Sequence, residues 1–408
     1  MVQLLGFEAA SSDALGSLGR PLHHYGTKKK AVRMRIALML YGGIGGGFMA
    51  EGVPVVQQYA HRLGKHCALT VFSMLRPAQA FAPSTYSFLH AGGHVGGSVK
   101  WSALRLAYRF AQEHRRQPFD LLHVLWGYPA GFWGAWIARL FSLPFVLTLQ
   151  GGEVVYLPEY RYGALGKKRV ATRLQYAYKQ AKRIICLSCY QKNKLPAQWH
   201  HKVQVLPWGV DIRHFAFKEK NIEYPLRFLH VANLQPLKRS IEALQFFEYF
   251  IRQTQIPARL DIVGDGSAVP SLWKYVQNEP LLSRSVHFWG HLSHKKLPAF
   301  YQEAHFFLHP SAYEAQGVVL AEAMASGAVV VSSVVGMAAD LLNEHATFIP
   351  WVTHEALTQT ILHMLNKPRL YVAMQQEARR QIELHFDQGK HMESMLKIYE
   401  QVLKNTSQ

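Results

Sequence analysis

The chain has 408 residues, 49% of them hydrophobic, which is enough for two or three domains that each bury a core. Its 30 Gly and 19 Pro are near average use, which excludes collagen-like and wholly disordered chains. The formal net charge of +19 lies entirely in residues 1–210, which hold 26 Lys and Arg against 7 Asp and Glu, while residues 211–408 hold 19 of each. This asymmetry favours an anionic partner for the first half: nucleic acid, a membrane surface or a phosphorylated substrate.

The first 33 residues are interpreted as an N-terminal extension that is poorly ordered or not translated at all. They contain no uninterrupted apolar region of the secretory type, and Met34 directly precedes the first predicted strand. The most apolar stretch, Val124–Leu149, is broken by two prolines and an arginine, so no spanning helix is predicted. The sequence therefore predicts a cytoplasmic protein, either soluble or peripheral on the inner face of the cytoplasmic membrane.

Short apolar runs alternate with longer amphipathic stretches along the rest of the chain. The strands predicted in the first half are Ile36–Leu40, Leu69–Phe72, Leu121–Leu125, Phe145–Leu149, Ile184–Leu187 and Val203–Leu206. Those predicted in the second half are Phe228–Val231, Leu260–Val263, Val286–Phe288, Phe306–His309 and Val329–Val331. One helix is expected to start near Pro54 and to end just before Gly64. Continuously apolar strands separated by helices are typical of parallel sheets covered on both faces.

This α/β pattern holds too many units for one sheet and predicts two Rossmann-like domains. The predicted organisation is a first domain over 34–210, a linker over 211–225, a second domain over 226–385 and a terminal helix over 386–408 that packs back towards the first domain. The linker is assigned because "KEKNIEYP" is charged, polar and without periodicity.

A run of glycines from Gly42 to Gly47 directly follows the first predicted strand. Without side chains, Gly45 and Gly46 would let backbone N–H groups approach phosphate oxygens at the carboxyl end of a parallel sheet. The run does not match a dinucleotide-binding fingerprint, and a merely flexible turn is the alternative.

The segment "HPSAYEAQGVVLAEAMASG" (309–327) carries the strongest chemical signal. A predicted strand ends at His309, a loop holds Glu314, and a helix beginning near Gly317 holds Glu322. The unpaired N–H groups at that helix start favour phosphate, and the two carboxylates can accept hydrogen bonds from ribose and sugar hydroxyls. Either glutamate alone could equally be a solvated or helix-start acid.

With these residues, the chain resembles the family-4-type retaining glycosyltransferases of the GT-B fold, also called glycosyltransferase group 1. The resemblance rests on Pro310, Ser311, Glu314, Glu322, Ala323, Met324, Ala325 and Gly327, and on the segments "HVLWGYPAG", "VLPWGVDIRHF", "VANLQPLKRS", "LDIVGDG" and "VHFWGHLSHKKLPAFY". It covers about residues 34–400. It implies two Rossmann-like domains facing each other across a cleft, and a nucleotide diphosphate sugar as donor substrate.

The resemblance also implies roles for particular residues. Glu322 is expected to hold the ribose of the donor, and Glu314 to touch the transferred sugar. Lys238 stands at the family's diphosphate-binding position, where a cation offsets the charge of the leaving group. The backbone of 315–318 is expected to line the sugar pocket, through Gln316, Gly317 and Val318. No metal or cofactor is required in this scheme.

Two positions depart from the family's pattern. Asn233 stands where an Arg commonly partners the Lys, and Arg239 is the neighbouring cation that could compensate. Gln150, in "QGGE", replaces a His that often contacts the donor sugar; with Glu153 and His123 it is a candidate sugar or acceptor contact.

Cysteine and histidine spacing gives no reason to expect a metal site. Cys186 and Cys189 have C-x-x-C spacing but no second pair, and His287, His291 and His294 fall on a predicted strand end and loop.

The function predicted from the sequence is sugar transfer from a nucleotide diphosphate sugar to a glycan or lipid-linked acceptor in polysaccharide or glycolipid synthesis. The basic first half is the expected acceptor domain, facing an anionic membrane or phosphorylated lipid. Nucleic acid is not expected as a partner, because no nucleic-acid motif accompanies the charge. Two alternatives stay open: a non-catalytic nucleotide-sugar-binding or scaffold protein, and a phosphorolytic or epimerising enzyme of the same fold.

Overall fold

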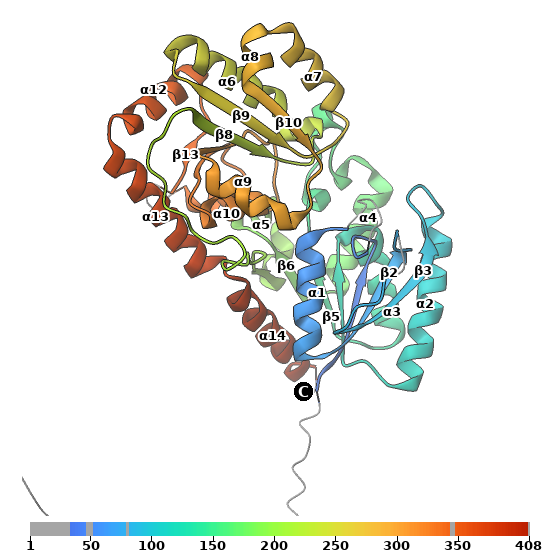
Figure 1. Ribbon diagram of the computed structural model, residues 1–408. Coiled ribbons are helices and arrows are strands. Elements are labelled where there is room, and N and C mark those ends of the chain that lie inside the picture. The colour runs from blue at the N-terminus through green and yellow to red at the C-terminus, as the bar shows by residue number, and fades with distance from the viewer. Residues whose placement is uncertain (1–32, 46–51, 79–80, 343–346, 407–408) are drawn as a thin grey trace, which may run out of the picture. The chain divides into compact units, whose positions relative to one another are not determined.

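The computed structural model describes residues 33–45, 52–78, 81–342 and 347–406. The expected N-terminal extension lies outside the described residues apart from Arg33, and so does Gly46 of the glycine run. The unit from Met34 to Gln408 contains two parallel sheets, each accompanied by helices (Figure 1). The predicted fold class, two Rossmann-like parallel-sheet domains with C-terminal helices, is confirmed.

The N-terminal sheet has seven strands in the order β3-β2-β1-β4-β5-β6-β7. Their bounds are β1 Arg35–Leu40, β2 Ala68–Leu75, β3 Ser87–Gly93, β4 Leu121–Leu125, β5 Phe145–Thr148, β6 Arg183–Cys186 and β7 Val203–Val205. The helices between them are α1 Pro54–His66, α2 Val99–Arg116, α3 Phe132–Leu140, α4 Lys168–Gln180 and α5 Cys189–Lys194. The central strands β4 and β5 are buried throughout, and apolar apart from His123 and Thr148, because helices cover both faces of the sheet.

The C-terminal sheet has six strands in the order β10-β9-β8-β11-β12-β13. Their bounds are β8 Leu226–Val231, β9 Ala258–Val263, β10 Val286–Gly290, β11 Phe306–His309, β12 Val329–Ser332 and β13 Ile349–Pro350. The helices are α6 Ser240–Thr254, α7 Val269–Asn278, α8 Pro280–Ser285, α9 Leu297–Glu303, α10 Val318–Ala325, α11 Met337–Leu341, α12 His354–Leu365, α13 Pro368–His385 and α14 Gln388–Lys404. In both sheets the strand order reverses between neighbouring strands, β1 and β4 in one and β8 and β11 in the other. Ligands of open α/β sheets bind outside the carboxyl ends of strands at such reversals.

Three details of the secondary structure differ from the sequence prediction. β3 and β13 were not predicted: β3 mixes glycine and histidine with its apolar residues, and β13 is only two residues long. Gly64 does not follow the first helix but lies inside α1, which continues to His66. A Cβ at Gly64 would lie 2.3 Å from the carbonyl oxygen of Thr85, so this glycine permits close approach of a neighbouring segment and does not end the helix.

The last helix, α14, packs into the core of the N-terminal sheet. Its apolar side chains share a cluster with residues of β1, and the Tyr399 hydroxyl lies 2.7 Å from Nδ1 of His123 in β4. Two segments connect the two sheets, one near Val210 and one near Phe386. They lie side by side, because the Val210 N–H donates to the Phe386 carbonyl at 2.7 Å. In the part of the chain that the structure describes, no helix combines the length and apolarity that crossing a bilayer demands.

Four buried histidines make stability depend on pH. Burial lowers the pKa of His123 to about 3 and the pKa values of His230, His305 and His391 to about 4. The unfolded chain gains a proton at each histidine near pH 6.5, whereas the folded chain gains it only at much lower pH. The free energy of unfolding therefore falls as pH drops below 6.5, by about 1.4 kcal/mol per pH unit for each histidine.

We expect the urea concentration at the unfolding midpoint to decrease as the pH is lowered from 7.5 to 5. In His123→Gln this decrease should be smaller, whatever the stability of the variant at pH 7.5. His287→Gln, which changes an exposed histidine, is the matched control and should retain the full slope. Equal slopes in all three proteins would contradict the assignment of the pH dependence to the buried rings.

Candidate active site

Lys238 and Glu314 meet where the C-terminal sheet reverses its strand order. Lys238 ends a short 3-10 turn after β8, Glu314 lies in the loop after β11, and the Lys238 Nζ contacts Glu314 Oε1. Nε2 of His309, the last residue of β11, lies 3.2 Å from the same oxygen. Burial alone would raise the pKa of the Glu314 carboxyl, but the Lys238 ammonium and the His309 ring outweigh it and hold that pKa below its usual range. The structure thus brings together a carboxylate and a cation that were 76 residues apart in the sequence.

The loop from Pro310 to Gly317 directs the first turn of α10 towards this pair. Gly317 adopts a left-handed backbone conformation with φ +86° immediately before α10, which any other residue would adopt only with strain. Gly336 allows a second segment to approach, because a Cβ there would lie 2.3 Å from the Gln316 carbonyl oxygen. The N–H groups at the start of α10, including that of Val318, therefore lie on the same loop as Glu314, as the sequence predicted.

Glu322, one helical turn further along α10, is buried and already has two hydrogen-bonding neighbours. His294 Nε2 lies 2.8 Å from its Oε1, and the Tyr301 hydroxyl donates to its Oε2 at 3.1 Å. Both neighbours come from the segment that follows β10. Their presence was not predicted for this role, because no local pattern links residues 294 and 301 to residue 322.

The N-terminal half contributes a turn that follows β5 and contains Gln150 and Glu153. The Glu153 carboxylate accepts three backbone hydrogen bonds, from Gly127 (3.1 Å), Gln150 (3.0 Å) and Gly151 (2.6 Å). Glu153 thus fixes the turn. The Gln150 Oε1 accepts from the Trp208 indole N–H at 2.9 Å, while its Nε2 is buried without a hydrogen-bond partner among the described residues. An unpaired buried donor is costly, so Nε2 is the group of this turn that gains most from a sugar hydroxyl.

His123, a candidate sugar or acceptor contact, lies within the core of the N-terminal sheet. It belongs to β4, is fully buried, and has both ring nitrogens engaged: Nδ1 with the Tyr59 and Tyr399 hydroxyls, and Nε2 with the Thr148 hydroxyl at 2.7 Å. These contacts give His123 a role in packing the core, and its role as a sugar or acceptor contact stays a prediction.

The other residues predicted for the donor site lie in several separate places, and most of them have other partners. Asn233 is exposed in the loop after β8, and Arg239 pairs with Glu242 in the first turn of α6. Gln316 is committed to the backbone of Trp208, accepting from its N–H at 2.7 Å and donating to its carbonyl at 2.8 Å. Gly45, with φ +65°, accepts a hydrogen bond from Ala78 through its carbonyl. Lys238 is therefore the cation next to Glu314, and the roles assigned to the other residues stay predictions.

Several contacts hold the Glu314 loop against the N-terminal half. The Tyr313 hydroxyl donates to the Gly151 carbonyl at 3.0 Å, and the Ser188 hydroxyl donates to the Ala315 carbonyl at 2.5 Å. Asp340 accepts the N–H groups of Cys189 and Tyr190, at 2.7 and 2.9 Å. The loop that carries Glu314 thus touches the turn that carries Gln150. Within the described residues, no group of three or more His, Cys, Asp or Glu side chains is placed to hold a metal ion.

Two known protein families match the sequence of the chain. The sequence matches the family "Glycosyl transferases group 1" over residues 211–381 and "Glycosyltransferase Family 4" over residues 53–214. With its two Rossmann-like parallel-sheet domains, the chain has the GT-B fold. The chain belongs to the group 1 glycosyltransferases.

Individual relatives are distant. The chain is 23% identical over 323 residues to the Bacillus subtilis (strain 168) glycosyltransferase TuaC, which is named for teichuronic acid biosynthesis, covering 76% of this chain and 79% of the relative. It is 24% identical over 247 residues, 56% of each chain, to alpha-monoglucosyldiacylglycerol synthase of Streptococcus pneumoniae. Among solved structures, Anabaena Alr3699/HepE in complex with UDP-glucose has a TM-score of 0.69 at 18% identity, covering 90% of this chain and all of that one. At such identity the structural match shows the fold.

The Glu153 contacts can be tested by removing the charge while keeping the size. Glu153→Gln replaces a carboxylate oxygen that accepts hydrogen bonds with an NH₂ group that cannot, and so leaves buried backbone N–H groups unsatisfied. We expect a loss of about 1–3 kcal/mol in the free energy of unfolding, measured by urea denaturation. Glu159→Gln, an exposed residue six positions on, should change it by less than about 0.5 kcal/mol. Equal stability of the two variants would show that Glu153 does not hold the turn.

Proposed function

We propose that the protein transfers a hexose-type sugar from a nucleotide diphosphate sugar, with retention of anomeric configuration, to a glycan or lipid-linked acceptor. The observation that carries the proposal is the contact between Lys238 and Glu314 beside the first turn of α10. A cation, a carboxylate and a helix N-terminus at one strand reversal match the diphosphate, the sugar hydroxyls and the growing negative charge of such a donor.

The Lys238–Glu314 contact would exchange partners when the donor binds. The Lys238 ammonium would move to the diphosphate, whose charge rises as the sugar–phosphate bond breaks, and Glu314 would accept hydrogen bonds from sugar hydroxyls. Glu322, oriented by His294 and Tyr301, would accept from the ribose. The complex of Alr3699/HepE with UDP-glucose supports this donor class.

Retention would follow from attack on the same face from which the diphosphate leaves. The departing phosphate oxygen would take the proton of the acceptor hydroxyl as the new glycosidic bond forms. No metal is needed in this scheme, because Lys238 and the N–H groups of α10 provide the positive charge. The resemblance to the retaining family supports this stereochemistry.

A non-catalytic nucleotide-sugar-binding protein is the second candidate. It is favoured by Asn233, which is neutral and exposed, and by Arg239, whose guanidinium is engaged with Glu242. Both candidates predict donor binding, so only turnover separates them.

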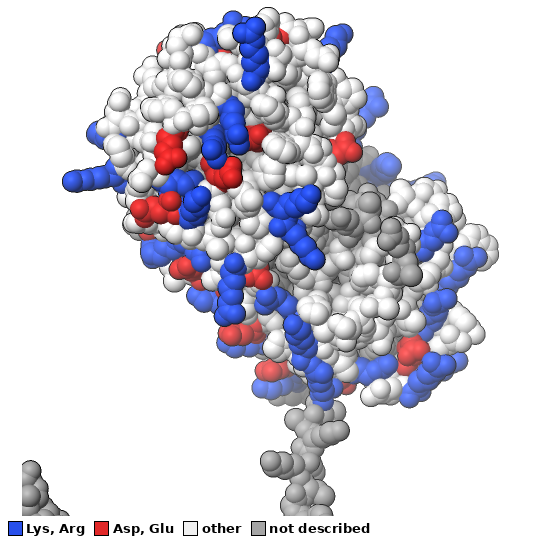
Figure 2. Space-filling model, viewed as in Figure 1, with Lys and Arg blue, Asp and Glu red and all other residues white. Residues whose placement is uncertain are grey.

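The acceptor side is proposed to rest on an anionic membrane. On α2, the side chains of Trp101 and Tyr108 are 64% and 66% exposed, Leu104 lies between them, and Arg105 and Arg109 flank them one turn apart. Aromatic rings with adjacent cations on one helix face suit a membrane–water interface. Figure 2 shows that blue cations outnumber red acids around the lower right of the viewed face, where α2 lies, and that both colours mix over the C-terminal half. The similarity to a diacylglycerol glycosyltransferase also supports a lipid acceptor.

The donor assignment is tested by transfer assays after nucleotide sugars have been screened for thermal stabilisation. We expect Lys238→Ala to lower kcat at least about 100-fold, and Glu322→Gln to raise the donor KM about 10-fold or more through a lost charged hydrogen bond. Lys274→Ala, an exposed lysine on α7, is the control and should be unchanged.

Unchanged transfer in both site variants would refute the assignment of the site. Donor binding without turnover in the unmodified protein would favour the non-catalytic candidate.

The membrane proposal is tested by sedimentation with vesicles that contain phosphatidylglycerol. Trp101→Ser combined with Tyr108→Ser should reduce the bound fraction at least about 5-fold, since two interfacial aromatic rings are lost. Trp273→Ser, which changes an exposed tryptophan of the other half, should bind like the unmodified protein. Binding that is equal in all three proteins would exclude this face of α2 from the contact.

A further inference from the structure

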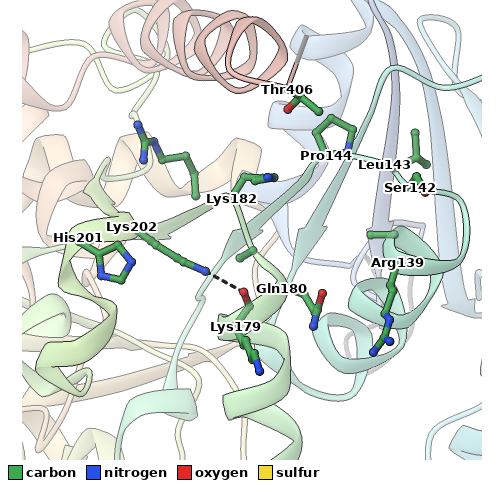
Figure 3. Close-up of a pocket in the computed structure, with 13 residues that line it drawn as sticks. Arg139, Ser142, Leu143, Pro144, Lys179, Gln180, Lys182, His201, Lys202 and Thr406 are labelled. Carbon is green, nitrogen blue, oxygen red and sulfur yellow. Dashed lines mark hydrogen bonds between the residues drawn. The ribbon is translucent and has the colours of Figure 1, made fainter. Parts of the chain in front are cut away.

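A cavity of about 610 Å³ opens at the amino ends of β5 and β6, away from the site described above (Figure 3). It is lined by the end of α3 with the turn Ser142–Pro144, by the end of α4 with the start of β6, and by His201, Lys202 and Thr406. The Gln150 turn follows the carboxyl end of β5, whereas Pro144 precedes its amino end. The length of the strand therefore separates this cavity from the Gln150 turn by about 15 Å.

The lining of the cavity is strongly cationic. Five cationic residues line it, together with His201 and without any Asp or Glu among the described lining residues: Arg139, Lys179, Lys182, Arg183 and Lys202. None of the five forms an ion pair with a carboxylate in the described part of the chain. Burial first, and the nearby charge of Lys182 second, lower the pKa of Lys202. The cations thus repel one another in the absence of an anion.

Helix ends account for only part of this charge. The carboxyl ends of α3 and α4 each carry about half a negative charge. Lys202 already serves α4: its Nζ donates to the carbonyl oxygens of Lys179 at 2.7 Å and Tyr178 at 3.4 Å, the former drawn in Figure 3. The two helix ends together carry about one negative charge, which one lysine balances. Of the five positive charges that line the cavity, roughly four therefore remain without a partner.

The turn after α3 adds a polar group to the same cavity. Ser142 adopts a left-handed backbone with φ +53°, which costs a non-glycine residue about 1–2 kcal/mol. The turn is closed by a hydrogen bond from the Leu143 N–H to the Ala138 carbonyl at 2.8 Å. The Ser142 hydroxyl and the Gln180 amide supply neutral donors among the cations, whereas the Thr406 hydroxyl already donates to the Val402 carbonyl at 2.7 Å.

We propose that this cavity binds a ligand carrying two or more phosphate groups, at a site distinct from the donor site. Arginine presents a planar fork that matches phosphate oxygens and lysine a mobile point charge, so the set suits clustered phosphates better than a single carboxylate. The volume lies within the range of small-molecule sites. The same chemistry is offered by a soluble oligophosphate and by an anionic lipid headgroup.

The test uses a double variant that removes two exposed lysines, Lys179→Gln with Lys182→Gln, whose side chains lie on the surface, so that folding should not be impaired. Its matched control is Lys167→Gln with Lys168→Gln, which removes two exposed lysines at the opposite end of the same helix. Binding of sodium tripolyphosphate is measured by calorimetry at physiological salt, in the Lys238→Ala background as well, to separate binding at the donor site. Binding to vesicles of phosphatidylcholine with cardiolipin is measured by sedimentation.

We expect at least a 10-fold weaker affinity for one or both probes in the Lys179/Lys182 variant and less than a 2-fold change in the control. If the Lys179/Lys182 variant loses affinity for tripolyphosphate, the ligand is a soluble oligophosphate. If it loses affinity for the vesicles alone, the ligand is a lipid headgroup. The proposal would be overturned if the affinity for the probes fell equally in the two double variants. It would also be overturned if the unmodified protein bound neither probe. Sugar transfer from a soluble donor should be unchanged in the Lys179/Lys182 variant, so this result is independent of the proposed transferase activity.

Discussion

The contact between Lys238 and Glu314 is the interaction on which the arrangement of the C-terminal half depends. The Glu314 side chain is 12% exposed, and the Lys238 ammonium and the His309 ring hold the pKa of its carboxyl below the usual range, so it stays ionised beside a compensating charge. The pair joins the loops after β8 and β11, which are adjacent strands on either side of the reversal in strand order. Glu314 lies in the loop that leads into α10, so the pair stands next to the start of that helix.

The same loop is held from the other side by the N-terminal half. Tyr313 and Ala315, on either side of Glu314, each contact a residue of that half through a hydrogen bond. The next residue, Gln316, is bonded to the backbone of Trp208, whose indole in turn orients Gln150. Any movement of one half relative to the other would therefore change the surroundings of Glu314 directly. The N-terminal half thus holds the residues on either side of Glu314, while Lys238 and His309 contact the carboxylate itself.

Much of this could be predicted from the sequence. Continuous apolar strands and the spacing of Glu314 and Glu322 sufficed for the parallel sheets and for the loop–helix that carries both carboxylates. What could not be predicted depends on contacts between distant segments. His294 and Tyr301 reach Glu322 only because the segment after β10 folds over α10, and the oxygens of Glu153 are taken up by a turn and by Gly127. The contact of His123 with Tyr399 could not be predicted for the same reason, since the two residues lie 276 positions apart in the sequence.

The fold does not by itself require the net positive charge of the N-terminal half. Both halves are parallel sheets with helices that end at the amino edge of the strands, and such helix ends favour cations wherever they occur. Yet residues 211–408 build that architecture with 19 cations and 19 anions, whereas residues 1–210 hold 26 cations and 7 anions. Since the same architecture needs no net charge in one half, the helix ends cannot require +19 in the other. The anionic partners proposed for α2 and for the cavity at β5 and β6 give a reason for this excess that the fold itself does not give.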